Sequence, residues 1–144
     1  MLDIDEITFL FDKGFSCSQI IFSEFAPRMG LSKEQALKIA GPFGGGMARL
    51  GNTCGAVTGA LMVLGLKYGM YKEGDSDTKE KNYLIAQEFI EQFTALHGSI
   101  SCKELLNYDI NNPKDYEILK EKNLFRTMCP KFVKDSMCIL EKLI

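Results

Sequence analysis

The chain has 144 residues, with 17 basic and 19 acidic side chains and a formal net charge of −2 at neutral pH. This balanced and scattered charge lacks the basic footprint of a nucleic-acid-binding protein, so we expect no nucleic-acid partner. The length suffices for one domain with its own hydrophobic core, and we expect a single domain over residues 1–144.

The N-terminal segment indicates where the protein resides. Asp3, Asp5 and Glu6 stand where a secretory signal would carry its apolar stretch, so we expect a cytoplasmic protein. The longest uncharged apolar run, residues 56–66, is too short for a membrane span. Five cysteines, an odd number, in a reducing compartment argue against a permanent disulfide framework and indicate reactive thiols, metal ligands or buried apolar residues.

Two helices are predicted before residue 30. Apolar residues at helical spacing indicate the first over residues 3–13, which Gly14 ends. Ser16 and Gln19 then have the spacing of a capping box ahead of an apolar run. This pattern places Cys17 at the first position of the second helix.

A second capping pattern, at Ser32, predicts a short third helix over residues 33–40. Five of the seven residues in 41–47 are glycine or proline, which excludes a regular helix there. Thr53 is then a plausible N-cap for a central apolar helix that carries Cys54 in its first turn. Small residues on one face of this helix would let another helix approach closely; they are Gly55, Ala56, Gly59 and Ala60.

The longest amphipathic segment follows, with Asp77 as its predicted N-cap and Gly98 as its stop. His97, the only histidine, then lies at a helix C-terminus, where the dipole favours it. Long apolar helices of this kind could also provide the face of a homodimer. The predicted core-facing residues are Tyr83, Leu84, Ala86, Phe89, Ile90, Phe93 and Leu96.

Three more helix starts complete the chain. Ser101 heads a further capping box that places Cys102 at a first helical position. Pro113 suits the first turn of another helix, and Cys129 with Pro130 predicts the start of the last one. Because no alternating strand pattern occurs, we predict an all-α, compact, single-domain multi-helix bundle with a glycine-rich loop before a central apolar helix.

Four cysteines thus fall at predicted helix starts, namely Cys17, Cys54, Cys102 and Cys129, whereas Cys138 lies inside the last helix. A helix N-terminus lowers the pKa of a thiol, and we expect Cys54 to be the most activated one. Convergent helix ends would form one catalytic site for thiol–disulfide exchange or electron transfer with an unknown redox partner. The same four thiolates are also the usual ligands of zinc or an iron–sulfur cluster. The separations of 37, 48 and 27 positions contain no C-x-x-C, so neither a zinc ribbon nor a thioredoxin-like motif is supported. A non-catalytic helical interaction module with buried cysteines is the third possibility.

The glycine loop supplies further candidate residues. Gly44, Gly45 and Gly46 permit close approach to a bound group, and Arg49 is placed to stabilise a thiolate or an anionic ligand. We therefore regard these four residues as candidates for cofactor binding. A phosphate-binding loop is not expected, because Asn52 replaces the lysine of that motif and no strand precedes it.

The cysteines and their surroundings resemble the family named for its cysteine pattern, C_GCAxxG_C_C, whose members are described as redox-active. Residues 54–59, CGAVTG, have the form CGAxxG and correspond to the central motif, with the cysteine before the glycine rather than after it as in the family's name. The similarity covers nearly the whole chain. The resemblance implies that the four cysteines at predicted helix starts are the functional ones. The pattern also resembles the non-haem part of split-Soret cytochromes, which implies an iron–sulfur or other metal centre. The chain has no C-x-x-C-H, so covalent haem is not expected.

Overall fold

The predicted all-α class is confirmed in the computed structural model, which describes all 144 residues. The only β-type pairing is one isolated antiparallel bridge. The α-helices are α1 (Ile4–Asp12), α2 (Cys17–Phe25), α3 (Lys33–Ala40), α4 (Gly55–Tyr68), α5 (Ser76–His97), α6 (Cys102–Leu106), α7 (Pro113–Glu121) and α8 (Leu124–Leu143), and the 3₁₀ helices are η1 (Ala26–Met29) and η2 (Gly41–Phe43).

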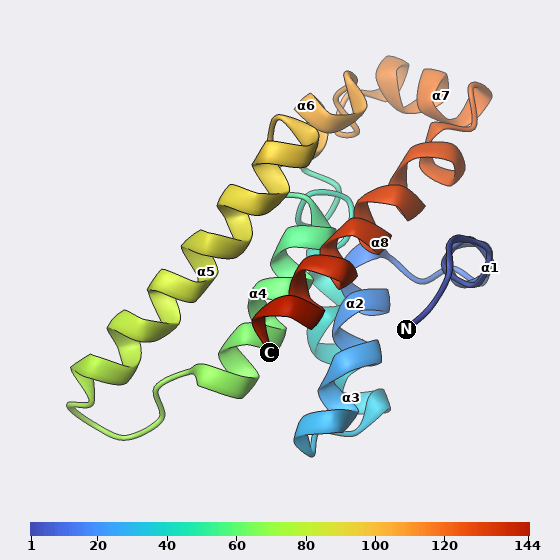
Figure 1. Ribbon diagram of the computed structural model, residues 1–144. Coiled ribbons are helices and arrows are strands. Elements are labelled where there is room, and N and C mark those ends of the chain that lie inside the picture. The colour runs from blue at the N-terminus through green and yellow to red at the C-terminus, as the bar shows by residue number, and fades with distance from the viewer.

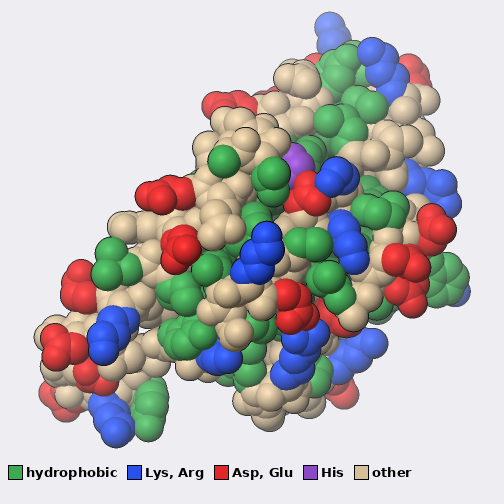
Figure 2. All heavy atoms as spheres, in the orientation of Figure 1, with side chains coloured by type: hydrophobic (Ala, Val, Ile, Leu, Met, Phe, Trp, Pro, Cys, Tyr) green, Lys and Arg blue, Asp and Glu red, His purple; other side chains and the backbone are tan.

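The helices surround one hydrophobic core to which each of the eight α-helices contributes. Helices α2, α4 and α8 lie in the middle, the long α5 runs along one side, and α6 and α7 lie together at one end (Figure 1). None of the helices combines the length and apolar character that a membrane span requires. Basic and acidic side chains are interspersed on the face drawn in Figure 2, without a basic stripe.

Close packing of α2 against α4 depends on two glycines. A Cβ atom on Gly55 would lie 3.0 Å from the Cβ of Cys17, and one on Gly59 would lie 2.9 Å from the carbonyl oxygen of Ser18. Both distances are shorter than ordinary van der Waals contact, so only glycine allows the two helices to lie this close. The predicted helix approach at these small residues is confirmed.

Two buried hydroxyl groups fasten neighbouring helices to this pair. Ser18 Oγ donates to the carbonyl oxygen of Ala40 at 2.9 Å, which links α2 to the end of α3. Ser136 Oγ donates to the carbonyl oxygen of Ala56 at 2.7 Å, which links α8 to the first turn of α4. Buried hydroxyls need such partners, so these bonds help to fix the spacing of the helices.

The helix starts with local capping signals are confirmed. The Gln19 side chain accepts from the Ser16 backbone N–H at 3.0 Å, and Ser32 and Gln35 form both bonds of a capping box. Gly98 ends α5 with a φ of 84°, as its position predicts. The signals succeed because the bonding atoms lie within four residues of one another.

Two other capping predictions are wrong, although α6 begins at Cys102 as predicted. The N-cap of α5 is Asp75 and not Asp77, since the Asp75 carboxylate accepts from the Thr78 N–H at 3.3 Å. Ser101 is the N-cap of α6 as predicted, but no capping box forms there because the Glu104 carboxylate accepts from the hydroxyl of another serine. These side chains choose between nearby partners that a spacing pattern does not distinguish.

The predicted core face of α5 is too wide. Phe89 and Phe93 are fully buried, whereas Tyr83, Leu84 and Leu96 are more than half exposed. The reason is that α5 lies at the outside of the bundle, where α4 and α8 cover only one side of it (Figure 1).

The predicted start of the last helix is also wrong. Helix α8 begins at Leu124, after Asn123 in a left-handed conformation, and Pro130 lies inside it. Cys129 therefore lies in the second turn and not at a helix N-terminus. Because Pro130 has no N–H, it cannot bond the carbonyl group of Arg126 as other residues of the helix would.

Two substitutions in α4 test the close approach. Gly59→Ala places a methyl group against the backbone of Ser18, and we expect the free energy of unfolding to fall by about 1–3 kcal/mol. Gly65→Ala is the matched control, because nothing lies within 4 Å of the added atom. There we expect a gain of about 0.5–1 kcal/mol from helix propensity. Urea unfolding under reducing conditions measures both, and equal effects of the two changes would contradict the packing argument.

Candidate functional site

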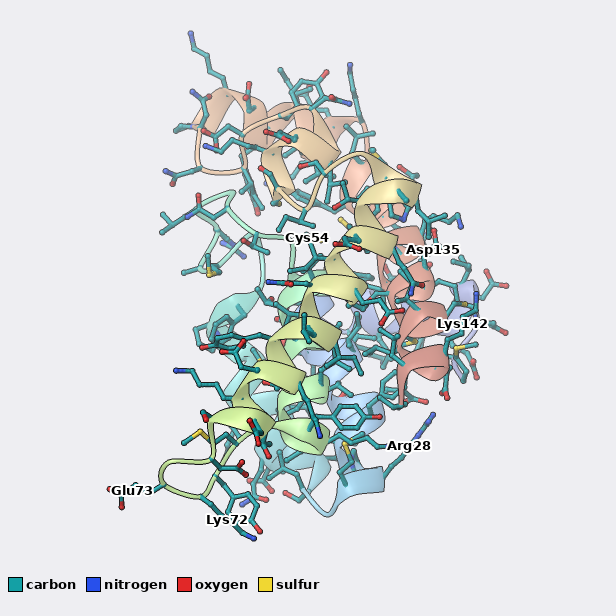
Figure 3. All side chains as sticks on the ribbon, turned by 60° about the vertical axis from the view of Figure 1, so that its left-hand side comes forward. Arg28, Cys54, Lys72, Glu73, Asp135 and Lys142 are labelled. Carbon is teal, nitrogen blue, oxygen red and sulfur yellow. The ribbon has the colours of Figure 1, made fainter.

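The four cysteines predicted to act together line one cavity of about 570 Å³. They come from four helices: Cys17 from α2, Cys54 from the start of α4, Cys102 from α6 and Cys129 from α8. Cys138 does not line the cavity. In Figure 3, Cys54 lies toward the end of the molecule that carries the glycine loop and α6. None of the five cysteines forms a disulfide in the structure.

Cys17 is the central thiol of the cluster. It occupies the first position of α2, as predicted, and interacts with the thiols of both Cys54 and Cys129. Cys17 keeps partial exposure, whereas the other three thiols in the cavity are buried. This exposure belongs to the residue as a whole, because burial still helps to raise the pKa of the Cys17 thiol.

Cys54 and Cys102 are held by backbone bonds between two distant segments. The Cys54 N–H donates to the carbonyl oxygen of Ile100 at 2.7 Å, and the Cys102 N–H donates to that of Asn52 at 2.6 Å. These two bonds flank the isolated bridge of the fold. The start of α6 is thereby fixed beside the start of α4.

This pairing corrects the predicted start of the central helix. Thr53 does not cap α4, because it pairs with Ser101 in the antiparallel bridge. Cys54 is itself the N-cap residue, and α4 begins at Gly55. The Cys54 sulfur still lies at the helix N-terminus, one position earlier than predicted.

The glycine loop has an unusual backbone. Five consecutive residues, Gly45–Arg49, have φ values of 66°, 69°, 67°, 52° and 62°. Such left-handed residues cost about 1–2 kcal/mol each when they are not glycine, which applies to Met47, Ala48 and Arg49. Strain of this kind is found where the surrounding structure imposes it, often at functional sites.

The candidate cofactor-binding residues also line the cavity. Gly44, Gly45, Gly46 and Arg49 are all in its wall. A Cβ atom on Gly46 would lie 2.7 Å from the Cβ of Cys102, so the loop packs directly on a cavity cysteine.

The only histidine lies elsewhere. The Nε2 atom of His97 is 3.0 Å from a carboxylate oxygen of Asp135, and its ring packs against Phe93 and Phe132. Because His97 does not line the cavity, it forms no Cys–His pair there.

The predicted acidification of Cys54 is wrong. Its pKa is raised well above the ordinary value, first by hydrogen bonding with the Cys17 thiol and then by burial. The backbone N–H groups of Ala56 and Val57 act to lower the pKa of Cys54, as a helix N-terminus should, but their effect is smaller.

Two other cavity thiols also hold their protons tightly. The pKa of Cys17 is raised by hydrogen bonding with Cys129; hydrogen bonding with Cys54 opposes this effect, and burial adds to it. Burial, followed by the neighbouring charges of Cys54 and Asp109, raises the pKa of Cys102 to about 12. Three of the cavity thiols are therefore protonated near neutral pH.

The donor chemistry of four thiols suits zinc or an iron–sulfur cluster. The positions of the side chains do not suit a metal site, because no three of the His, Cys, Asp and Glu side chains are placed to hold a metal ion. The structure therefore gives the predicted metal centre no support.

One comparison with known proteins gives a match. The family model described as "Putative redox-active protein (C_GCAxxG_C_C)" matches residues 15–143. The chain belongs to this family. No curated protein and no solved structure matches it. Within the family motif, residues 54–59, the structure assigns a role to both glycines, since Gly55 and Gly59 are the positions that allow α2 to pack on α4.

The apolar walls of the cavity were not predicted. Tyr116 of α7 and Phe125 and Phe132 of α8 line it together with Leu105 and Leu106 of α6. Their spacing in the sequence is that of ordinary core residues. No local signal distinguishes a side chain that faces a cavity from one that fills the core.

The raised pKa of Cys102 predicts a loss of stability at alkaline pH. Above pH 9.0 the unfolded chain releases this proton while the folded chain keeps it up to about pH 12. The unfolded state then binds fewer protons, so the free energy of unfolding falls as pH rises. We expect the stability of wild type relative to Cys102→Ala to fall by about 2 kcal/mol between about pH 8 and about pH 10.5.

Urea unfolding in the presence of a reductant measures this difference. Contributions from Cys17 and Cys54 have the same sign but occur in both proteins and cancel. A difference between wild type and variant that is constant across this pH range would contradict the prediction.

Proposed function

We propose that the protein carries out thiol–disulfide exchange with Cys17 as the attacking thiol and Cys54 as the resolving thiol. The observation that supports this function best is the position of Cys17, which lies next to two other thiols inside one cavity. Membership of a family described as redox-active agrees with it.

The choice of Cys17 as the attacking residue follows from accessibility. It is the only cavity cysteine with partial exposure, while Cys54 is 4% exposed. Cys54 is preferred over Cys129 as the resolving partner because the next residue, Gly55, packs directly against Cys17. Cys102 and Cys129 complete the thiol cluster and can take part in later exchange.

The reaction conserves atoms and electrons in two steps. The Cys17 thiolate attacks one sulfur of a substrate disulfide, whose S–S bond breaks, and half of the substrate leaves as a thiolate. The Cys54 thiolate then attacks Cys17, and the second half leaves. Two electrons pass to the substrate, and the protons of the two protein thiols go to solvent or to the leaving thiolates.

Because the pKa values of Cys17 and Cys54 are raised, the rate of disulfide exchange should rise with pH. The reason is that only the thiolate attacks.

Thiol counting tests the proposal. Reduced protein has five thiols; after treatment with a small disulfide, we expect Cys17 and Cys54 to be lost as a pair, apart from any reaction of the partly exposed Cys138, and peptide mapping to identify a Cys17–Cys54 bond. Cys17→Ser should abolish this paired loss. Cys138→Ser is the matched control and should retain it, since Cys138 lies outside the cavity.

Metal analysis of protein purified without oxygen supplies the competing outcome. The protein could contain about one zinc or iron centre per chain, and a chelator could remove the metal and make the thiols reactive at the same time. This result would overturn the exchange proposal in favour of a metal site. Metal-free native protein that keeps all five thiols would overturn it in favour of a structural role.

A further inference from the structure

Arg49 differs from the other two arginines of the chain. Arg28 pairs with Glu141 at 2.8 Å, and Arg126 pairs with Asp12 at 3.1 Å. The Arg49 guanidinium has neither an acidic partner nor a hydrogen bond within the protein. It lies over the ring of Tyr116, 5.9 Å from the centroid, at the wall of the thiol cavity.

Arg49 supplies the only charge in the wall of the cavity. Among the residues that line it, Arg49 is the only charged one, and no Asp, Glu or Lys is present. The remaining wall is formed largely by apolar side chains and glycine backbone. A cation in such surroundings favours a ligand with one anionic group on an otherwise apolar body.

The glycine loop adds unsatisfied hydrogen-bond donors. The backbone N–H groups of Gly44, Gly45 and Gly46 donate to no oxygen of the protein, although all three residues line the cavity. Backbone donors beside an arginine are the combination that binds carboxylate and phosphate groups in many sites.

The left-handed turn accounts for how Arg49 reaches this position. Arg49 itself has a φ of 62°, and its N–H bonds to the carbonyl oxygen of Gly44 at 3.3 Å. Bonds across the turn from Ala48 to Pro42 and from Asn52 to Gly46, both 2.8 Å, keep the strained backbone in place. The fold thus holds Arg49 and the three glycines with free N–H groups in the wall of the cavity that contains the thiols.

We infer that the glycine loop and Arg49 form an anion-binding subsite, and that the substrate is a small, largely apolar disulfide that carries a carboxylate. The inference rests on the proposed exchange function and deepens it. The carboxylate binds to Arg49 and the glycine N–H groups, which positions the disulfide for attack by Cys17. A cavity of about 570 Å³ accepts a molecule of this size.

Two aromatic disulfides that differ in charge test the inference. Dithiobis(nitrobenzoate) carries a carboxylate on each half, and dithiodipyridine is neutral. We expect Arg49→Gln to lower the rate of cavity-thiol loss about tenfold with the first and to leave the second unchanged, which is the effect of losing a charge-assisted hydrogen bond. Arg49→Lys should restore part of the rate, because it keeps the charge without the planar fork.

Lys72→Gln is the matched control for net charge. Lys72 lies in the loop between α4 and α5, at the opposite end of the molecule from Cys54 (Figure 3), and its removal should leave both rates unchanged. Urea unfolding of each variant confirms that the fold is intact. An equal change for both disulfides in Arg49→Gln, or an equal effect of Lys72→Gln, would overturn the inference.

A binding measurement separates this inference from the proposed function. Benzoate should shift the amide resonances of Gly45 and Gly46 in the reduced protein, and uncharged benzamide should not. Benzoate binding that is lost in Arg49→Gln, in a protein whose thiols do not react, would support the anion subsite and overturn the exchange function. Disulfide exchange without benzoate binding or carboxylate preference would overturn the subsite alone.

Discussion

The contact between the first turns of α2 and α4 is the one on which the site depends. Gly55 and Gly59 leave no side chain between the helices, so the backbone around Ser18 lies directly against α4. Cys17 and Cys54 become neighbours because each stands at the start of its helix. The two glycines of the family motif therefore have a structural role that directly serves the thiols.

The same close packing has a chemical consequence. Hydrogen bonding with Cys129 raises the pKa of Cys17, and hydrogen bonding with Cys17 raises the pKa of Cys54. Burial adds to both shifts, although both cysteines stand at helix starts. Helix position alone is therefore a poor guide to the reactivity of a thiol. Residue exposure is the reason to propose that Cys17 reacts first, and the raised pKa values keep both thiols protonated at neutral pH.

The glycine loop completes the cavity from the other side. Its left-handed turn is costly for Met47, Ala48 and Arg49, and it persists because Gly46 packs on Cys102 and backbone bonds close the turn. A relaxed loop would not hold an unpaired arginine beside four thiols. Strain, close packing and the position of the cation are thus parts of one arrangement.

The sequence by itself determined most of the helices, the starts of α2 and α3 and the stop of α5, because these follow from apolar periodicity and from side chains within four residues of the backbone groups they cap. The family resemblance came from the cysteine pattern. The sequence also identified the cysteines and the loop residues that line the cavity.

The tertiary structure decided the rest. The N-cap of α4 depends on the bond from the Cys54 N–H to Ile100. Pro130 lies inside α8, because this helix begins earlier than the position that Pro130 predicted for its start. The outer face of α5 stays exposed. Burial, distant hydrogen bonds and the direction of a pKa shift exist only after segments far apart in the chain have packed together.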